Sequence, residues 1–219
     1  MLERLVTGRR RLLVVQQKHW SEILVGYETR NRFELCDEEG ALLGTALEEG
    51  GGMLRWVGRQ LLGRCRKATV HLLDPTGAEF ARIEKPFRWY FQEATLHDGE
   101  RAVGRVARRF SLLRDRFTVQ DLSGRDLLEI ERGFFDHFRF RGTFRVRLNG
   151  LEVALIRKEW RGLIAEAFTD ADTFGVEFTE ESLDVDVRKL LVAAVFLIDF
   201  TCFENNRGRG VVGLPFGND

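Results

Sequence analysis

The sequence predicts a mainly β protein, a closed antiparallel barrel of about 12 strands that encloses an apolar C-terminal helix. Two observations predict this fold. Short segments of alternating apolar and polar residues recur along the chain and are joined in pairs by turns rich in Asp, Asn and Gly. Near the C-terminus every residue from 190 to 198 is apolar, the pattern of a helix with no face toward water.

Five hairpins are expected, each built on a turn in which Asp or Asn is followed by Gly. Asp98–Gly99 and Asn149–Gly150 are the tightest, because both turn residues tolerate positive φ. The other turns span residues 37–40, 74–77 and 121–124. Closely spaced hairpins favour an antiparallel sheet over βαβ units. Alternation within the flanking segments indicates one buried and one solvated face.

Other segments complete the expected fold. Strands are predicted near residues 12–17, 134–140 and 174–178, which brings the strand count close to that of a large barrel. Residues 53–62 carry apolar side chains at helical spacing, and residues 160–168 form a second short helical segment. We expect these one or two short helices at the periphery.

The apolar C-terminal helix is expected over about residues 186–204. A membrane span needs about 20 apolar residues. Asp199 would place a carboxylate near the bilayer centre, which costs about 2.5–3.5 kcal/mol of insertion free energy. A helix about 10–12 Å across fits inside a barrel of more than about eight strands. The sequence therefore favours the enclosed helix, with a single-pass membrane protein as the alternative. The residues that define this helix are Leu190, Leu191, Val195, Phe196, Leu197, Ile198, Asp199 and Phe200.

Length and composition bound the remaining possibilities. The 219 residues suit one domain, expected over residues 1–206, followed by a flexible tail over 207–219. Basic and acidic residues number 34 each, which argues against binding nucleic acid through overall charge. The three cysteines are far apart, and the N-terminal residues lack a signal-peptide pattern. We therefore expect a cytoplasmic protein without a disulfide framework.

Several stretches of the chain are similar to one known family. Residues 157–178 and 183–200 form a long C-terminal series, residues 26–34 read Gly-Tyr-Glu-Thr-Arg-Asn-Arg-Phe-Glu, and Glu84-Lys85-Pro86 follows. Together they resemble the phospholipid scramblase family over about residues 12–204. That family is similar in fold to tubby and to the plant LURP-one-related proteins, which are barrels around a central helix.

The resemblance implies a membrane-associated protein that binds phospholipids, or moves them in both directions between leaflets in a calcium-linked way. Eukaryotic members carry a cysteine-rich run where palmitate attaches, whereas residues 87–91 here contain no cysteine. The Pro-rich N-terminal tail of those members is also absent. Both departures suggest a minimal, bacterial-type member that associates peripherally with a membrane.

The resemblance also places a calcium segment on residues 170–181. Asp170, Asp172 and Glu181 stand first, third and twelfth, as in an EF-hand loop, and Asp184 follows. Phe174, however, occupies the fifth position, where an oxygen ligand is expected. Weak Ca²⁺ binding is one interpretation. The other is a strand in which Phe174, Val176 and Phe178 face the core, whereas Glu177 and the flanking acidic residues are solvated.

A basic stretch is the candidate lipid-binding site. Cations beside Trp and Leu suit a membrane surface that contains anionic lipids, which is the expected partner. The alternative is a helix that caps the barrel with its arginines in water. Because arginine binds lipid and nucleic-acid phosphates alike, a soluble regulatory module that binds phosphoinositide or nucleic acid is the alternative function. The candidate residues are Arg55, Trp56, Arg59, Leu61, Arg64, Arg66 and Lys67.

Aromatic residues form a third candidate feature, at residues 87–91 and 134–140. Adjacent Trp89, Tyr90 and Phe91 cannot all face one side of a strand, so some are expected to be exposed to lipid or a partner. No nucleophile elbow and no Walker loop occur in the sequence, and we expect no enzymatic activity.

Overall fold

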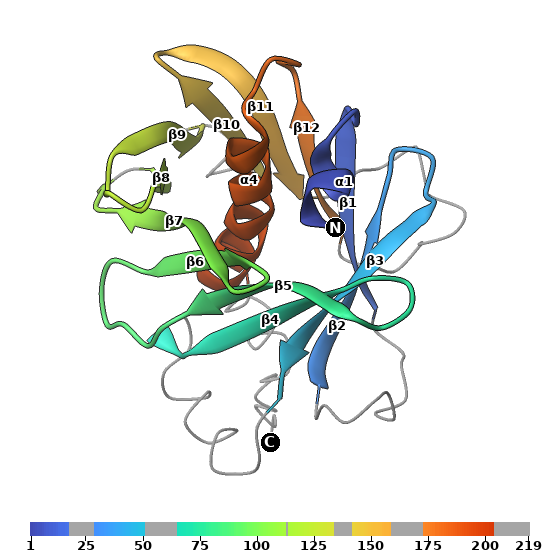
Figure 1. Cartoon of the computed structure of the whole chain (residues 1–219). Helices are drawn as coiled ribbons and strands as arrows, with labels where there is room; N and C mark the ends of the chain where they lie inside the picture. Colours follow the sequence, from blue (N-terminus) through green and yellow to red (C-terminus); the bar gives the residue numbers. More distant parts are fainter. Residues whose placement is uncertain (18–28, 51–64, 113, 134–141, 159–172, 204–219) are drawn as a thin grey trace, which may run out of the picture.

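The computed structural model describes residues 1–17, 29–50, 65–112, 114–133, 142–158 and 173–203 (Figure 1). Within these ranges, 12 antiparallel strands close into one barrel, and the C-terminal helix lies inside it. The predicted fold class and the enclosed helix are both confirmed.

Each strand pairs with its neighbours in sequence. The strands are β1 Arg11–Gln17, β2 Thr29–Cys36, β3 Leu42–Glu49, β4 Ala68–Leu73, β5 Glu79–Lys85, β6 Glu93–Asp98, β7 Arg101–Arg109, β8 Arg116–Gln120, β9 Asp126–Arg132, β10 Thr143–Leu148, β11 Leu151–Lys158 and β12 Thr173–Phe178. The five predicted hairpins are all present, and β12 closes the barrel on β1 by pairing Val176 with Leu12. The strand predicted near residues 134–140 lies outside the described residues, and the barrel closes without it.

The tight turns follow the predicted chemistry. Asn149 and Gly150 both have positive φ, 50° and 84°, between β10 and β11. Gly99 has a φ of 59° between β6 and β7. The predicted turn pair Asp98–Gly99 is shifted by one residue, because Asp98 ends β6 and pairs with Arg101, which leaves Gly99 and Glu100 in the turn. These left-handed conformations are favourable for Gly and tolerated by Asn, which is why such pairs join antiparallel strands.

The C-terminal helix comprises α4, Val185–Ile198, and a π-helical continuation η2, Asp199–Phe203. Its bounds agree with the predicted 186–204 to within one residue. Residues 190–198 are each at most 1% exposed, because inward-facing strand residues surround them. Phe33 of β2, for example, meets Phe196 edge-on with ring centroids 5.3 Å apart. Among the described residues, no helix combines the length and apolar character that a bilayer crossing requires.

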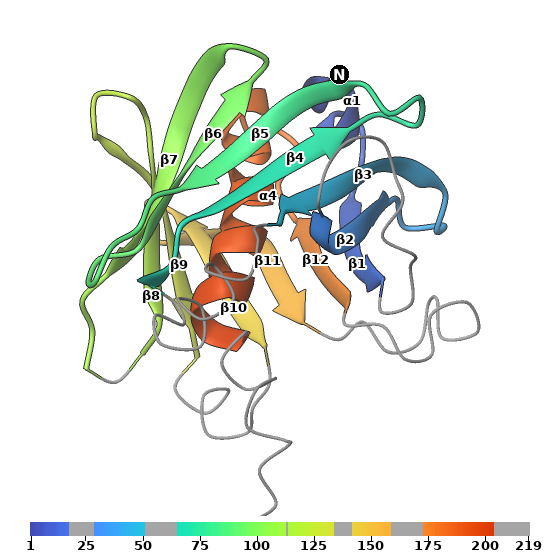
Figure 2. The same ribbon diagram turned by 90° about the horizontal axis from the view of Figure 1, so that it is seen from below.

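The two ends of the barrel differ. At one, the α1 end, the short helix α1 Leu2–Val6 packs against the start of α4 and buries Leu2, Leu5 and Val6 (Figure 1). The sequence did not predict α1, because five residues are too few to show a helical period. The other, the η2 end, lies at the bottom of Figure 2, where the odd-numbered strands finish. The helices predicted at 53–62 and 160–168 lie outside the described residues.

Candidate functional site

The η2 end carries a cluster of exposed apolar side chains, which we call the apolar rim. Its members come from the β5–β6 and β7–β8 connections, which leave the lower part of the barrel in Figure 2. They are between 43% and 86% exposed, whereas residues of these types are usually buried. The rim consists of Phe87, Trp89, Tyr90, Phe91, Phe110 and Leu112.

The backbone beneath the rim is held in place by hydrogen bonds. The Arg88 amide donates to the Cys65 carbonyl at 3.1 Å, and the Cys65 thiol donates to the Trp89 carbonyl at 3.5 Å. Buried Gln92 donates from its side-chain amide to the Arg88 carbonyl. The main chain of this connection is therefore tied to the barrel while its aromatic side chains remain in solvent.

The two connections that form the rim are neighbours. Glu93 at the start of β6 pairs with Ala107 near the end of β7, and the Arg108 amide donates to the Gln92 carbonyl at 2.7 Å. This pairing places Phe110 and Leu112 beside the β5–β6 connection. The sequence patterns did not predict either residue as part of a site. An available signal was the apolar run that follows Arg108 and Arg109 outside any alternating segment.

Only part of the predicted basic stretch can be placed. Arg55, Trp56, Arg59, Leu61 and Arg64 lie outside the described residues. The Arg66 guanidinium pairs with the carboxylate of fully buried Glu48 at 2.6 Å and lies 5.1 Å from the Phe200 ring centroid. Lys67, the next residue, is exposed. The structure therefore separates two neighbours that the sequence grouped together, because Arg66 takes part in a buried ion pair.

Other arginines of the middle region also have polar or acidic partners. Arg108 pairs with Asp115 at 2.7 Å, Arg109 with Asp126 at 2.9 Å, and Arg116 with Glu131 at 2.6 Å. Arg105 donates to the Gln120 side chain at 2.8 Å. These interactions compensate much of the local positive charge.

The calcium segment is described only at its C-terminal end. Asp170 and Asp172 lie outside the described residues. Glu181 is exposed, and Asp184 is the N-cap of α4, accepting from the amides of Asp186 at 2.8 Å and Val187 at 3.2 Å. Among the described residues, no three His, Cys, Asp or Glu side chains are grouped to hold a metal ion.

Residues 173–178 form β12, as the strand interpretation predicts. Phe174, Val176 and Phe178 are buried against the central helix. The expectation that Glu177 is solvated is wrong, because this residue is only 8% exposed. Its carboxylate accepts from the Arg11 guanidinium at 2.9 Å across the β1–β12 pair, so burial is matched by an ion pair.

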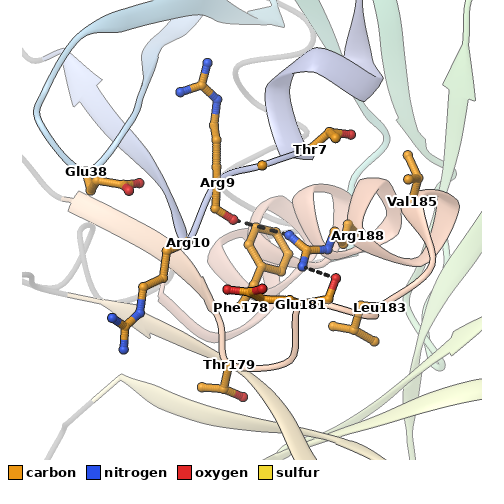
Figure 3. Close-up of a pocket in the computed structure, with 11 residues that line it drawn as sticks. Thr7, Arg9, Arg10, Glu38, Phe178, Thr179, Glu181, Leu183, Val185 and Arg188 are labelled. Atoms are coloured by element: carbon orange, nitrogen blue, oxygen red, sulfur yellow. Dashed lines mark hydrogen bonds between the residues drawn. The ribbon is translucent and has the colours of Figure 1, made fainter.

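A pocket of about 740 Å³ lies at the α1 end (Figure 3). Buried Arg188, from the first turn of α4, lies within it above the Phe178 ring. Its two terminal nitrogens donate to four main-chain carbonyls at 3.0–3.2 Å, those of Val6, Arg9, Glu180 and Glu181. Arg188 thus joins the N-terminal segment, the β12–α4 connection and the helix, and acts as a structural tie.

Two cysteines have unreactive environments. Burial, together with Glu34 and Asp37 nearby, raises the pKa of the Cys36 thiol to about 11. Burial is also the main cause that raises the pKa of Cys202 to about 12. Both thiols are protonated at neutral pH, and the thiolate is the reactive form. Neither cysteine is a candidate nucleophile.

Comparisons with known proteins identify relatives over most of the chain. Residues 1–205 match the family model described as Scramblase. Phospholipid scramblase 2 of Bos taurus is 31% identical over 210 residues, covering 90% of this chain and 70% of the relative. Phospholipid scramblase 1 of Mus musculus is 32% identical over 88% of this chain, and that of Homo sapiens 30% identical over 89%. The chain spans 61% and 63% of those two relatives. No solved structure shows significant similarity to it.

Proposed function

Because the chain belongs to the phospholipid scramblase family, we propose that it acts on phospholipids at a membrane surface. It binds the membrane peripherally, through the outside of the barrel, and moves phospholipids between leaflets in a calcium-linked way. Family membership supports the lipid substrate. The closed barrel around a helix supports our placement of the chain beside the tubby-like and LURP-one-related proteins. We also propose a bacterial-type member, since residues 87–91 contain no cysteine.

The observation that carries the peripheral arrangement is the burial of the central helix. Residues 190–198 include seven Leu, Ile, Val or Phe side chains, each at most 1% exposed. Burying one such side chain fully contributes about 1.5–3 kcal/mol, so these seven together contribute on the order of 10–20 kcal/mol. A whole domain is stable by only about 5–15 kcal/mol. Withdrawing the helix would also leave the inward-facing strand residues without the core they pack against, so the barrel would be disrupted. Lipid contact is therefore left to the barrel exterior.

Calcium is proposed as a weak cofactor of the segment that contains Asp170, Asp172, Glu181 and Asp184. The exposed carboxylate of Glu181 supports this proposal, as do the spacings of the acidic residues. The Oδ1 atom of Asp184 already accepts two helix amides, which is consistent with low affinity. The cytoplasmic side is proposed as the site of action, because Cys36, Cys65 and Cys202 are free thiols, as expected in a reducing compartment.

Flotation with vesicles tests membrane binding. The native chain is mixed with vesicles of phosphatidylcholine alone, or with added phosphatidylserine, with and without calcium, and separated on a density gradient. We expect flotation with the anionic vesicles, increased by calcium. Absence of flotation under every condition would contradict the proposed function and point to a soluble phosphate ligand such as a nucleic acid.

A second assay tests transport. Vesicles that contain a fluorescent phospholipid in both leaflets are treated with dithionite, which bleaches the outer leaflet only. With the native chain and calcium present, we expect dithionite to bleach a larger fraction of the fluorescence than the outer leaflet holds. A signal equal to that of protein-free vesicles, together with normal flotation, would leave a lipid-binding protein without transport.

A further inference from the structure

We propose that the apolar rim inserts into the interface of an anionic phospholipid membrane and orients the barrel with its η2 end on the lipid. This inference rests on the proposed function and assigns the membrane-contact surface to side chains of this chain. The membrane therefore meets the end of the barrel where the central helix finishes, opposite α1.

The distribution of exposed aromatic side chains is the first argument. Every exposed aromatic residue among the described residues belongs to the rim. Exposed Leu residues also occur at the α1 end, but they are aliphatic and lie on three different hairpins, with Leu148 and Leu151 opposite each other across one of them. These exposed Leu residues are Leu42, Leu122, Leu148 and Leu151. Contiguous exposed apolar side chains mark interaction sites, whereas scattered ones are ordinary.

The side-chain chemistry of the rim suits a lipid interface. Trp89 is 64% and Tyr90 79% exposed, and both have an apolar ring with a polar group that favours the headgroup level. Phe91, Phe110 and Leu112 are wholly apolar and suit the acyl boundary. Phe87 braces Trp89 edge-on, with ring centroids 5.2 Å apart.

The backbone of the rim is already held, before membrane binding, in the conformation that exposes the aromatic side chains. Phe91 has a φ of 50°, a left-handed conformation that is uncommon for a bulky residue. Such a conformation persists only where surrounding contacts enforce it, here through Gln92 and Cys65. A preformed rim loses little further conformational entropy when it binds.

Charges around the rim favour an anionic membrane. Lys67 and Arg114 flank the rim, are exposed and have no acidic partner among the described residues. Arg88, in the β5–β6 connection, is exposed and forms an ion pair with Glu93. Cations at the headgroup level attract anionic lipids, so the rim and its flanks together resemble the surface of a peripheral membrane protein.

The test compares two matched pairs of substitutions by vesicle binding. The rim variant is Trp89→Ala with Tyr90→Ala. The control is Leu122→Ala with Leu151→Ala, which removes exposed side chains from the α1 end. We expect the rim variant to lose about tenfold or more in affinity for phosphatidylserine-containing vesicles, and the control to bind like the native chain. Both variants should melt at the native temperature, because all four side chains are exposed.

A second readout reports contact directly. Brominated phospholipids quench the fluorescence of Trp in the bilayer, and Trp89→Phe removes this reporter while keeping an apolar ring. We expect the native chain to be quenched more than Trp89→Phe, with equal vesicle binding. Three outcomes would overturn the inference. The first is a rim variant that binds vesicles like the native chain, the second is an equal loss of affinity in the rim and control variants, and the third is quenching of the native chain and Trp89→Phe to the same extent. The proposed function fails differently, because the native chain itself would then not bind.

Discussion

The ammonium group of Lys189, on the enclosed helix, lies 2.9 Å from the carboxylate of Asp98 at the end of β6. The same group lies 3.0 Å from Asp186, which also accepts from Arg101 at 2.7 Å. Lys189 is only 5% exposed, whereas the side chains of its partners Asp98 and Asp186 are 25% and 43% exposed. This network anchors the first turn of α4 to the β6–β7 hairpin.

The network predicts a pH dependence of stability. Burial alone would raise the pKa of Asp186, but hydrogen bonds from Lys189 and Arg101 outweigh it and lower the pKa below its usual 3.8. Its contribution to stability is therefore present above pH 3.8 and lost as the pH falls through the lower folded value. We expect Asp186→Asn to lose less stability than the native chain between pH 7 and pH 3, measured by urea unfolding.

Lys189 contributes to the pH dependence of stability at alkaline pH. Burial alone would lower the pKa of Lys189, but hydrogen bonds to Asp98 and Asp186 raise it above its usual 10.5. Its contribution to stability is complete below pH 10.5 and lost as the pH rises through the higher folded value.

As a control for the Asp186→Asn test, Glu39→Gln removes an exposed carboxylate and should keep the native pH profile. An Asp186→Asn profile identical to the native one would contradict the assignment.

Gly104 of β7 lies close against the central helix. A Cβ atom there would lie 2.5 Å from the Gln120 carbonyl oxygen and 2.9 Å from Leu190 Cδ1. We expect Gly104→Ala to destabilise the protein by about 1–3 kcal/mol in urea unfolding, as overpacking does. Adding Leu190→Ala removes one of the two clashes, so the double variant should lose less than the sum of the single variants. Strict additivity would argue against this close packing.

Asp184 has a structural role that is separable from calcium binding. Asp184→Ala removes the N-cap of α4, and we expect a loss of about 1 kcal/mol without calcium. Asp184→Asn keeps a capping oxygen and should retain most of that stability. If calcium uses this carboxylate, the increase in melting temperature that calcium produces will be smaller in both variants. An increase unchanged in Asp184→Asn would remove Asp184 from the calcium site.

Arg66 and Lys67 are expected to differ although they are adjacent. Arg66→Ala leaves the fully buried carboxylate of Glu48 without its guanidinium, and loss of one partner of a buried pair costs about 3–5 kcal/mol. Lys67→Ala should change stability by less than about 0.5 kcal/mol. It should weaken binding to phosphatidylserine vesicles by roughly fivefold, since one cation near the surface contributes about 1 kcal/mol. A large loss of stability in Lys67→Ala, with native stability in Arg66→Ala, would refute the different roles assigned to these two residues.

Cys36 serves as a probe of the closed barrel. Its thiol is 1% exposed and its pKa is raised to about 11, so alkylation at pH 8 should be much slower than that of half-buried Cys65. We expect mass spectrometry of the native protein to show modification of Cys65 first and of Cys36 only after urea unfolding. Equal labelling of both in native buffer would indicate that β1 and β2 open.

The architecture was predictable because it follows from local patterns repeated many times. Alternating segments joined by Asp-Gly and Asn-Gly turns specify hairpins, since a strand shows its two faces at a period of two residues and the turn demands positive φ. The run from residue 190 to 198 specifies a helix that must be surrounded on all sides. These signals depend on neighbours in sequence, so the sequence alone determined the barrel and the helix within it.

The candidate site depended on contacts between distant segments. Whether Arg66 faces a lipid or a buried carboxylate is decided by its position next to Glu48, and Glu177 is buried because strand register places it beside Arg11. Likewise, the main chain of Trp89 is tied to Cys65 while its side chain stays 64% exposed. The sequence determined which residues are apolar or charged. Only the tertiary structure decided which of them are buried, paired or exposed, because the free energy of each depends on what the closed barrel places around it.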